Sequence, residues 1–343
     1  MKAVIDEKIP YIRGLAEQLV DEVCYMPGAD IGPADVRDAD ILLVRTRTRC
    51  DKRLLEGSRV RLVVTATIGF DHLDTAWLAT AGIQWTNCPG CNASSVCQYV
   101  HNALLVLSAF DGRFGPAPPT VGVVGVGHVG SLVADDLQRM GLRVLCCDPP
   151  LGLPVTLQQI AAEADIITFH TPLTRDGDCP TFHLADDVFF HRLERRPLLV
   201  NTSRGGVVDN VALLAALKDG RVCDAVLDVW EGEPAGLNRD LLERVAIGTP
   251  HVAGYSADGK ANATRMSLQA VSRFLGIPFT LQVHPDPLPS DYSYGPVTSG
   301  PLRLYDPRVD SQRLKQRPEL FEWLRGNYPL RREKADEQNK EAR

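Results

Sequence analysis

Three glycines spaced as G-x-G-x-x-G constrain the fold of this 343-residue chain more than any other feature. Gly125, Gly127 and Gly130 follow the apolar run "TVGVV" directly and open the helix-like stretch "HVGSLVADDLQRMG". The spacing alone is a weak signal, but the same spacing between a strand and a helix is specific. The stretch therefore predicts one strand, turn and helix of a parallel α/β sheet.

Each glycine of this turn has its own physical role. The first permits a tight turn, the second lets the backbone approach a pyrophosphate, and the third lets the helix and the strand pack closely. The N-terminus of the helix then holds the phosphates with its free backbone N–H groups and its dipole. Asp148 ends the next apolar run, where its carboxylate can accept hydrogen bonds from a ribose 2'-hydroxyl and repel a 2'-phosphate. We therefore predict that the cofactor is NAD.

The glycine turn lies well inside the chain, and apolar runs alternate with helical stretches on both sides of it. Residues 94–255 carry the most regular alternation, which predicts a Rossmann-type doubly wound parallel sheet. Residues 1–93 form an α/β region of their own, and 256–276 read as a long helix that returns the chain to it. We predict an NAD-binding domain at 94–255. It is inserted into a smaller flavodoxin-like α/β substrate domain at 1–93 and 256–282, and a short C-terminal segment follows at 283–343.

The residue pattern also predicts the individual elements. Helices are expected at 12–20, 75–82, 94–110, 128–141, 210–220 and 256–276, with one short helix within 311–328. Strands are expected at 2–6, 39–46, 59–67, 83–87, 120–126, 143–148, 164–170, 197–201, 223–229 and 244–250. Residues 331–343 are rich in charge and are predicted to be a solvated tail.

Composition limits the partners of the chain. The formal net charge is −6, and a nucleic-acid binder needs a basic surface, so we expect no nucleic-acid partner. No apolar stretch approaches the ~18 residues of a membrane span, and the first residues lack the pattern of a signal peptide. The nine cysteines show no disulfide framework, and the pair Cys88 and Cys91 lacks further ligands for a metal. We therefore expect a cytoplasmic protein with no metal site and no membrane contact.

Charged side chains follow the expected strands of the NAD-binding domain. Arg204 follows one strand, Asp228 and Glu233 come at the end of the next, and His251 follows a third. Ligands of open α/β sheets bind beyond the carboxyl ends of the strands. These side chains are therefore predicted to converge at one site.

The types of these side chains fit the oxidation of a 2-hydroxy acid by hydride transfer. His251 can accept the hydroxyl proton, since an imidazole titrates near neutral pH. Glu233 can fix the tautomer of the ring, and Arg204 can hold a carboxylate or the 2-oxygen through two parallel hydrogen bonds. Asp228 and Ser203 can meet the ribose or the amide of the nicotinamide half of the cofactor.

Three stretches, "NTSRGGVVDNVALLAAL", "LDVWEGEP" and "TPHVAGYS", resemble the signature of the D-2-hydroxyacid dehydrogenase family. The resemblance implies that Arg204, Glu233 and His251 are the catalytic residues. Further stretches such as "TATIGFDHLDTAWLATAGI" are similar to a branch of this family that oxidises 4-phospho-D-erythronate with NAD on the route to pyridoxal 5'-phosphate. The resemblance therefore implies a small phosphorylated 2-hydroxy acid as the substrate.

The resemblance also implies ligand contacts. Besides the three glycines of the turn, the residues that it places at NAD are Asp148, Thr171, Ser203, Asp228 and Gly254. The residues that it places at the substrate are Thr46, Thr67 and Tyr255. Arg45 and Arg47 flank Thr46 and are candidates for the substrate phosphate from their charge alone.

The branch dimerises through a C-terminal region, and the chain after residue 283 is shorter than that region. We therefore expect a homodimer with an abbreviated contact region. Two alternatives stay open. One is a related dehydrogenase that acts on phosphoglycerate, hydroxypyruvate or glyoxylate. The other is an NAD-sensing corepressor that uses the same fold to bind proteins.

Overall fold

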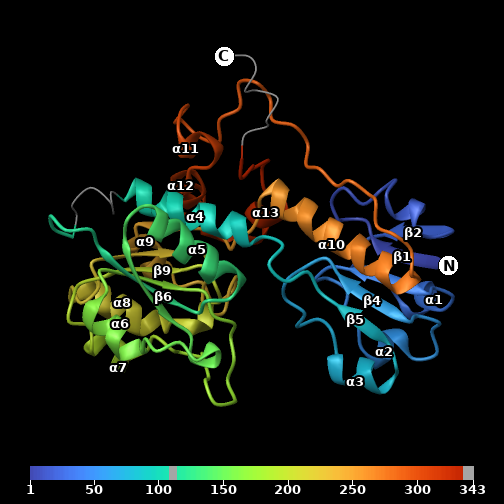
Figure 1. Cartoon of the computed structure of the whole chain (residues 1–343), viewed down its shortest axis with the longest axis horizontal. Coiled ribbons are helices and arrows are strands. Elements are labelled where there is room, and N and C mark those ends of the chain that lie inside the picture. The colour runs from blue at the N-terminus through green and yellow to red at the C-terminus, as the bar shows by residue number, and fades with distance from the viewer. Residues whose placement is uncertain (108–113, 335–343) are drawn as a thin grey trace. The chain divides into compact units, whose positions relative to one another are not determined.

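The computed structural model describes residues 1–107 and 114–334. The chain falls into two α/β units, each with its own parallel sheet (Figure 1). The first unit comprises Met1–Asn92 and Ala257–Pro287, and the second comprises Ala93–Ser256 and Leu288–Arg343. Residues Ala93–Ser256 of the second unit are thus inserted between the two segments of the first unit. The predicted fold class, a doubly wound sheet inserted into a smaller α/β domain, is confirmed.

The sheet of the first unit has five parallel strands in the flavodoxin-like order β2-β1-β3-β4-β5. Neighbouring residues of one strand, such as Val4 and Ile5, enter separate apolar clusters, so the sheet is covered on both faces. The long helix α10 packs against β4 (Figure 1). The strands are β1 (Lys2–Asp6), β2 (Glu22–Met26), β3 (Ile41–Val44), β4 (Leu62–Thr65) and β5 (Gln84–Thr86). The helices are α1 (Pro33–Val36), α2 (Lys52–Leu55), α3 (Thr75–Thr80) and α10 (Ala257–Leu275).

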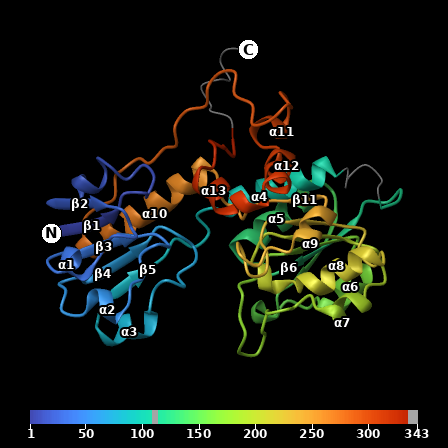
Figure 2. The ribbon, with the colours of Figure 1, turned by 180° about the vertical axis from the view of Figure 1, so that it is seen from behind.

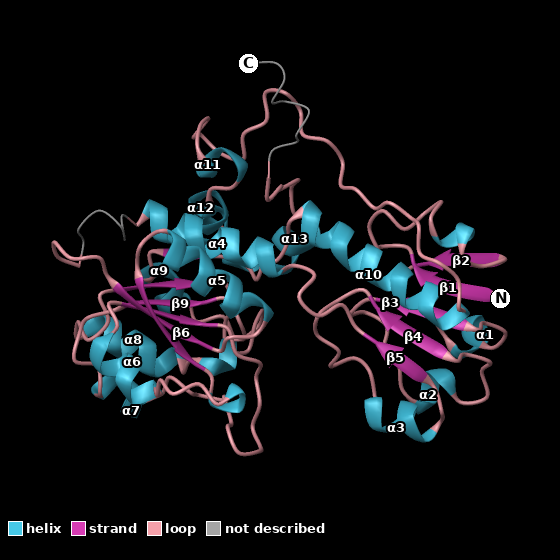
Figure 3. Cartoon of the chain, in the orientation of Figure 1, coloured by secondary structure: helices cyan, strands magenta, loops and turns pink. Residues whose placement is uncertain are grey.

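The sheet of the second unit has six parallel strands in the order β11-β10-β9-β8-β6-β7. Helices cover both of its faces, with α4 and α5 in one apolar cluster and α6 to α9 in the other (Figure 3). The strands are β6 (Thr120–Val124), β7 (Arg143–Cys147), β8 (Ile166–Phe169), β9 (Leu198–Asn201), β10 (Asp224–Leu227) and β11 (Ile247–Gly248). The helices are α4 (Ala93–Val106), α5 (His128–Arg139), α6 (Leu157–Glu163), α7 (Asp187–His191), α8 (Asn210–Lys218) and α9 (Arg239–Arg244). The strand order reverses between β6 and β8, which is where such sheets bind their ligands.

The C-terminal segment belongs to the second unit and packs on its edge strand. Helix α12 (Pro307–Gln316) contacts β11 and α4 (Figure 2), and the Ser311 hydroxyl accepts a hydrogen bond of 3.0 Å from the Gly248 N–H. Helices α11 (Pro301–Leu304) and α13 (Phe321–Gly326) flank it. The segment therefore stabilises the strand that leads to His251.

Several sequence predictions need correction. The stretch 12–20 forms only a short 3-10 helix, Ala16–Gln18, because Gly14 takes a φ of +78°. Strand β2 was not predicted, since it is an edge strand whose residues are mostly half-buried or exposed. The single short helix expected within 311–328 is two helices, because Asp306 and Pro307 start α12 early and Pro318 follows its end.

Two predicted segments extend beyond the described residues. Residues 108–110 of the helix expected at 94–110 and residues 335–343 of the expected tail lie outside them. Within residues 1–107 and 114–334, no helix combines the length and the apolar character that a membrane span needs.

Candidate functional site

The glycine turn lies at the carboxyl end of β6, next to the point where the strand order reverses. Gly125 has a φ of +86°, and a Cβ on it would lie 2.8 Å from the backbone carbon of His170. A Cβ on Gly130 would overlap the carbonyl oxygen of Gly125. A Cβ on Gly127 would meet no atom within 4 Å. The first and third glycines are therefore demanded by the packing, whereas the second leaves its backbone open to a ligand.

Asp148 follows β7 and points its carboxylate at the glycine turn. Its Oδ2 accepts a hydrogen bond of 2.7 Å from the Val126 N–H, and its Oδ1 accepts one of 3.3 Å from the Leu151 N–H. These bonds hold a half-buried carboxylate beside the turn, where each oxygen keeps a lone pair for another donor. The arrangement suits the hydroxyls of a ribose.

His170 and Thr171 follow β8 on the other side of the strand reversal. Burial lowers the pKa of His170 from 6.5 to about 3, so its ring is neutral, and it is hydrogen-bonded to Thr168 Oγ1 at 2.9 Å. The hydroxyl of Thr171 is buried and has no hydrogen-bond partner among the described residues. A buried hydroxyl of this kind needs a partner, which a ligand can supply. Together with the open face of Gly127 and the carboxylate of Asp148, it fits a bound dinucleotide.

A hydrogen-bonded turn after β9 presents Arg204. The buried Asn201 side chain accepts bonds from the Ser203 N–H at 3.0 Å and from the Ser203 hydroxyl at 2.8 Å, and its amide donates to the Arg204 carbonyl at 3.0 Å. Arg204 Nη1 donates to the Ser203 carbonyl at 2.8 Å. No carboxylate among the described residues pairs with this guanidinium. Its remaining donors are therefore available to an anionic ligand.

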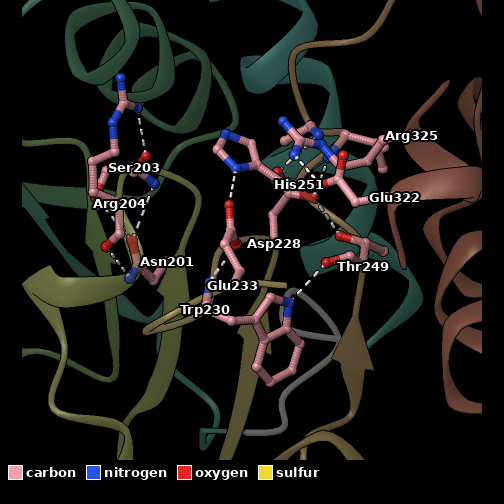
Figure 4. Close-up of polar contacts among 12 residues, drawn as sticks. Asn201, Ser203, Arg204, Asp228, Trp230, Glu233, Thr249, His251, Glu322 and Arg325 are labelled. Atoms are coloured by element: carbon pink, nitrogen blue, oxygen red, sulfur yellow. Dashed lines mark hydrogen bonds and ion pairs between the residues drawn. The ribbon is translucent and has the colours of Figure 1, made fainter. Parts of the chain in front are cut away.

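His251 follows β11 and Glu233 follows β10, and their side chains are in contact. Glu233 Oε1 contacts His251 Nδ1, and its other oxygen accepts a hydrogen bond of 2.9 Å from the Trp230 N–H. His251 has a φ of +58°, and its backbone N–H donates a hydrogen bond of 2.7 Å to the Asp228 carbonyl. A carboxylate at Nδ1 keeps the proton on that nitrogen, which leaves the lone pair of Nε2 for a ligand. Figure 4 shows the pair together with Arg204 at this edge of the sheet.

Asp228 organises the loop that carries His251. Its side chain is 1 % exposed and accepts hydrogen bonds from the Thr249 hydroxyl at 2.5 Å, the Val252 N–H at 2.8 Å and the Ala253 N–H at 2.9 Å. The indole N–H of Trp230 donates to the Thr249 carbonyl at 2.9 Å. The observed contacts of the Asp228 carboxylate are therefore with this loop, and its contact with the cofactor stays a prediction.

Arg331 also binds the loop that carries His251. Its Nη1 donates to the carbonyls of Val252 and Ala253, each at 3.2 Å, and its Nη2 donates to the Ser95 carbonyl at 2.7 Å. The side chain is 0 % exposed, so the expectation that residues 331–343 are solvated is wrong at Arg331. The planar guanidinium satisfies several carbonyls at once, and charge patterning does not reveal such partners.

Of the predicted substrate contacts, Tyr255 lies in the second unit and Thr46 and Thr67 lie in the first. The Tyr255 hydroxyl accepts a hydrogen bond of 3.4 Å from Arg325, and Gly254 precedes it in the same loop. The Thr67 hydroxyl donates to the Gly69 carbonyl at 2.8 Å, and Thr46 is exposed. Thr46 follows β3 and Thr67 follows β4, so both lie at the carboxyl edge of the first sheet.

Sequence reasoning missed three residues that shape the site. They are Asn201, Arg325 and Arg331. Asn201 was visible as a polar residue at the end of the apolar run "LLVN", which is the one signal that could have marked it. The two arginines lie far along the chain from the loops that they contact, and no local pattern marks such partners.

Comparisons with known proteins identify the family of the chain. The family model described as "D-isomer specific 2-hydroxyacid dehydrogenase, NAD binding domain" matches residues 114–253. Erythronate-4-phosphate dehydrogenase from Bacteroides fragilis is 52% identical over 98% of both chains. The protein of the same name from Escherichia coli O81 is 44% identical over 97% of this chain and 92% of its own.

Solved structures share the fold. D-lactate dehydrogenase from Aquifex aeolicus, complexed with NAD and lactic acid, aligns with a TM-score of 0.62 at 23% identity, over 80% of this chain and 96% of that one. The TT0316 protein from Thermus thermophilus aligns with a TM-score of 0.64 at 27% identity, with the same coverage.

The fold and the site thus define an NAD-dependent dehydrogenase of 2-hydroxy acids. The chain belongs to the D-isomer specific 2-hydroxyacid dehydrogenase family, and the curated relatives described above, which it matches over nearly its whole length, are erythronate-4-phosphate dehydrogenases. The predicted family and the predicted cofactor, NAD, are confirmed.

Proposed function

We propose that this protein oxidises 4-phospho-D-erythronate to 3-hydroxy-2-oxo-4-phosphooxybutanoate in the biosynthesis of pyridoxal 5'-phosphate. The observation that carries the proposal is the placement of Arg204, Glu233 and His251 at one edge of an NAD-binding sheet. The names of the relatives indicate the substrate.

His251 acts as the general base of the reaction. Its Nε2 takes the proton of the substrate 2-hydroxyl, while the hydrogen on C2 leaves with its electron pair. NAD supplies the acceptor for that hydride when it is bound. Glu233 holds the proton on Nδ1 and stabilises the ring once it is charged. The loss of one proton and one hydride turns the alcohol into the 2-oxo group.

Arg204 orients the substrate. Two parallel N–H groups of its guanidinium bind the C1 carboxylate, or one of them binds the 2-oxygen as it becomes a carbonyl. Because the Asn201 side chain fixes the turn that carries Arg204, little freedom is lost when the substrate binds.

The cofactor contacts are assigned to the second unit. The residues proposed to bind NAD are Gly125, Gly127, Gly130, Asp148, Thr171, Ser203, Asp228 and Gly254. The residues proposed to bind the substrate are Thr46, Thr67 and Tyr255. In this assignment 94–255 is the NAD-binding domain, 1–93 and 256–282 form the substrate domain, and the protein works in the cytoplasm as a homodimer joined through 283–343.

Steady-state kinetics with NAD test the proposal. The substrates are 4-phospho-D-erythronate and 3-phosphoglycerate, and hydroxypyruvate and glyoxylate are assayed with NADH in the reverse direction. We expect the highest kcat/KM with 4-phospho-D-erythronate. A higher value with one of the others would assign the chain to a related dehydrogenase. NAD binding without turnover of any of these acids would favour the corepressor alternative.

A further inference from the structure

Arg325 of α13 carries a buried donor that has no acceptor. Its Nε–H is buried and makes no hydrogen bond to the described residues. Its Nη1 donates to Glu322 Oε1 at 2.9 Å, and its Nη2 donates to the Tyr255 hydroxyl at 3.4 Å. A guanidinium has five N–H donors, so most of the donor capacity of Arg325 is not used by these two bonds. A buried donor in this state calls for an acceptor that a ligand brings.

This guanidinium borders the proposed catalytic site. Its central carbon lies 5.9 Å from the ring centroid of Tyr255, which follows His251 closely in the same loop. Burial alone would lower the pKa of Arg325, but the carboxylates of Glu322 and Glu233 and the hydrogen bond with the Tyr255 hydroxyl raise it, so the side chain is a permanent cation. Figure 4 shows Arg325 and Arg204 on opposite sides of the His251 ring.

We propose that Arg325 binds the phosphate of the substrate, an inference that rests on the proposed function. A four-carbon 2-hydroxy acid with a 4-phosphate is anionic at both ends, and its reacting carbon lies next to the carboxylate. With His251 at the reacting carbon and Arg204 at the carboxylate, the phosphate extends away from Arg204. Arg325 is a cation on that other side, and its planar fork matches two phosphate oxygens.

The pyrophosphate of NAD is a weaker candidate for the same cation. The open backbone of Gly127 at β6 already accounts for a pyrophosphate, and Arg325 contacts the loop after β11 instead. The strands β6 and β11 are separated in the sheet by β8, β9 and β10. The phosphate that Arg325 binds is therefore assigned to the substrate and not to NAD.

The test compares R325Q with wild type on two substrates, 4-phospho-D-erythronate and unphosphorylated D-erythronate. We expect R325Q to raise the KM for the phosphorylated substrate by about tenfold to a hundredfold, which is the range of a lost charge-assisted hydrogen bond. The kcat, the KM for NAD and the kcat/KM for D-erythronate should change little. R325K, which keeps the charge but lacks the fork, should recover part of the loss.

R317Q is the matched control, because Arg317 lies in the same C-terminal segment and is exposed, paired only with Glu319 among the described residues. It should behave as wild type. An equal loss of kcat/KM on both substrates in R325Q would show that Arg325 positions Tyr255 and would overturn the proposal, as would unchanged kinetics.

A binding measurement separates this proposal from the proposed function. Inorganic phosphate at millimolar concentration should raise the Tm of the wild-type protein and of R317Q above their values in chloride of equal ionic strength, but not that of R325Q. If wild type fails to oxidise 4-phospho-D-erythronate, the proposed function fails, and this measurement still decides the role of Arg325. Equal stabilisation of all three proteins, or of none, would contradict phosphate binding by Arg325.

Discussion

The two parallel sheets share one strand order, apart from the additional edge strand β11 of the second, but differ in the turn after the first strand. In the second unit, β6 leads into Gly125 and Gly127, and the face of Gly127 is open. In the first unit, β1 ends in Asp6, which is buried and accepts a hydrogen bond of 2.9 Å from the Lys8 N–H. A side chain therefore fills the turn of the first sheet where the second sheet leaves backbone exposed.

The strand that follows shows the same contrast. Strand β7 is followed by Asp148, a carboxylate at the carboxyl edge of the sheet, whereas β2 ends in the apolar Met26. The first sheet instead carries Arg45, Thr46 and Thr67 at its carboxyl edge. One architecture thus presents two different chemistries, because the loops at the strand ends and not the strands determine what is bound.

The largest expected effect comes from removing His251, the base proposed for the site of the second sheet. H251A should lower kcat by about 10² to 10⁴, because the general base is lost while the glycine turn is untouched. The measurement is kcat together with the Kd for NAD by calorimetry. An unchanged kcat would reject His251 as the base, and a matching loss of NAD affinity would place it in the cofactor site instead.

The next effect separates the roles of two glycines in the turn. G127A should leave the Tm unchanged and weaken NAD binding by about tenfold to a hundredfold, because its new methyl group meets no protein atom and intrudes on the ligand. G130A should lower the stability by roughly 1–3 kcal/mol or more, since its Cβ overlaps the Gly125 carbonyl. Thermal melting and NAD titration of both variants distinguish these outcomes. An NAD affinity in G127A equal to that of wild type would show that the pyrophosphate does not lie against the backbone of Gly127.

A smaller effect is expected at the ribose. D148A should weaken NAD binding by roughly tenfold, the value of one or two hydrogen bonds, and should narrow the preference for NAD over NADP. The ratio of kcat/KM for the two cofactors measures this. D148N is the control, since it removes the charge but keeps a side-chain oxygen for the Val126 N–H. A ratio that stays constant in both variants would mean that another group reads the ribose.

The smallest expected effect concerns a histidine that each sheet holds near its carboxyl edge. His72 bonds Thr65 and His170 bonds Thr168, each at 2.9 Å, and burial lowers the pKa of both rings. A depressed pKa means that the unfolded chain binds the proton more readily. The stability contributed by a neutral His170 is therefore complete above pH 6.5 and is lost as the pH falls towards about 3.

Melting curves between these pH values provide the test. H170Q should show a shallower fall in Tm with decreasing pH than wild type, and H72Q a smaller change of the same sign. If Tm changes with pH as steeply in H170Q as in wild type, the His170 ring is protonated in the folded protein.

Much of the fold could be read from the sequence for a definite physical reason. Strands such as β6 and β9 are buried on both faces, so they appear as unbroken apolar runs. Strand β2 escaped prediction because an edge strand with Glu22 at its start lacks that signal. The helix expected at 12–20 failed because the positive φ of Gly14 stops it, and helical periodicity does not register a backbone angle.

The site could be predicted only in part. Glu233 and His251 both follow strand ends, so the sequence could indicate that they meet. Arg331 and Arg325 bind loops far away in the chain, through backbone carbonyls and a tyrosine hydroxyl. Such partners leave no spacing to recognise, and only the packing distinguishes Arg331 from a residue of a solvated tail.

The most direct test of the central claim is a crystal structure of the protein with NAD. The account predicts the pyrophosphate against the backbone of Gly127, the adenosine ribose on Asp148 and the nicotinamide ring beside His251. A pyrophosphate bound at another place, such as the carboxyl edge of the first sheet, would contradict it.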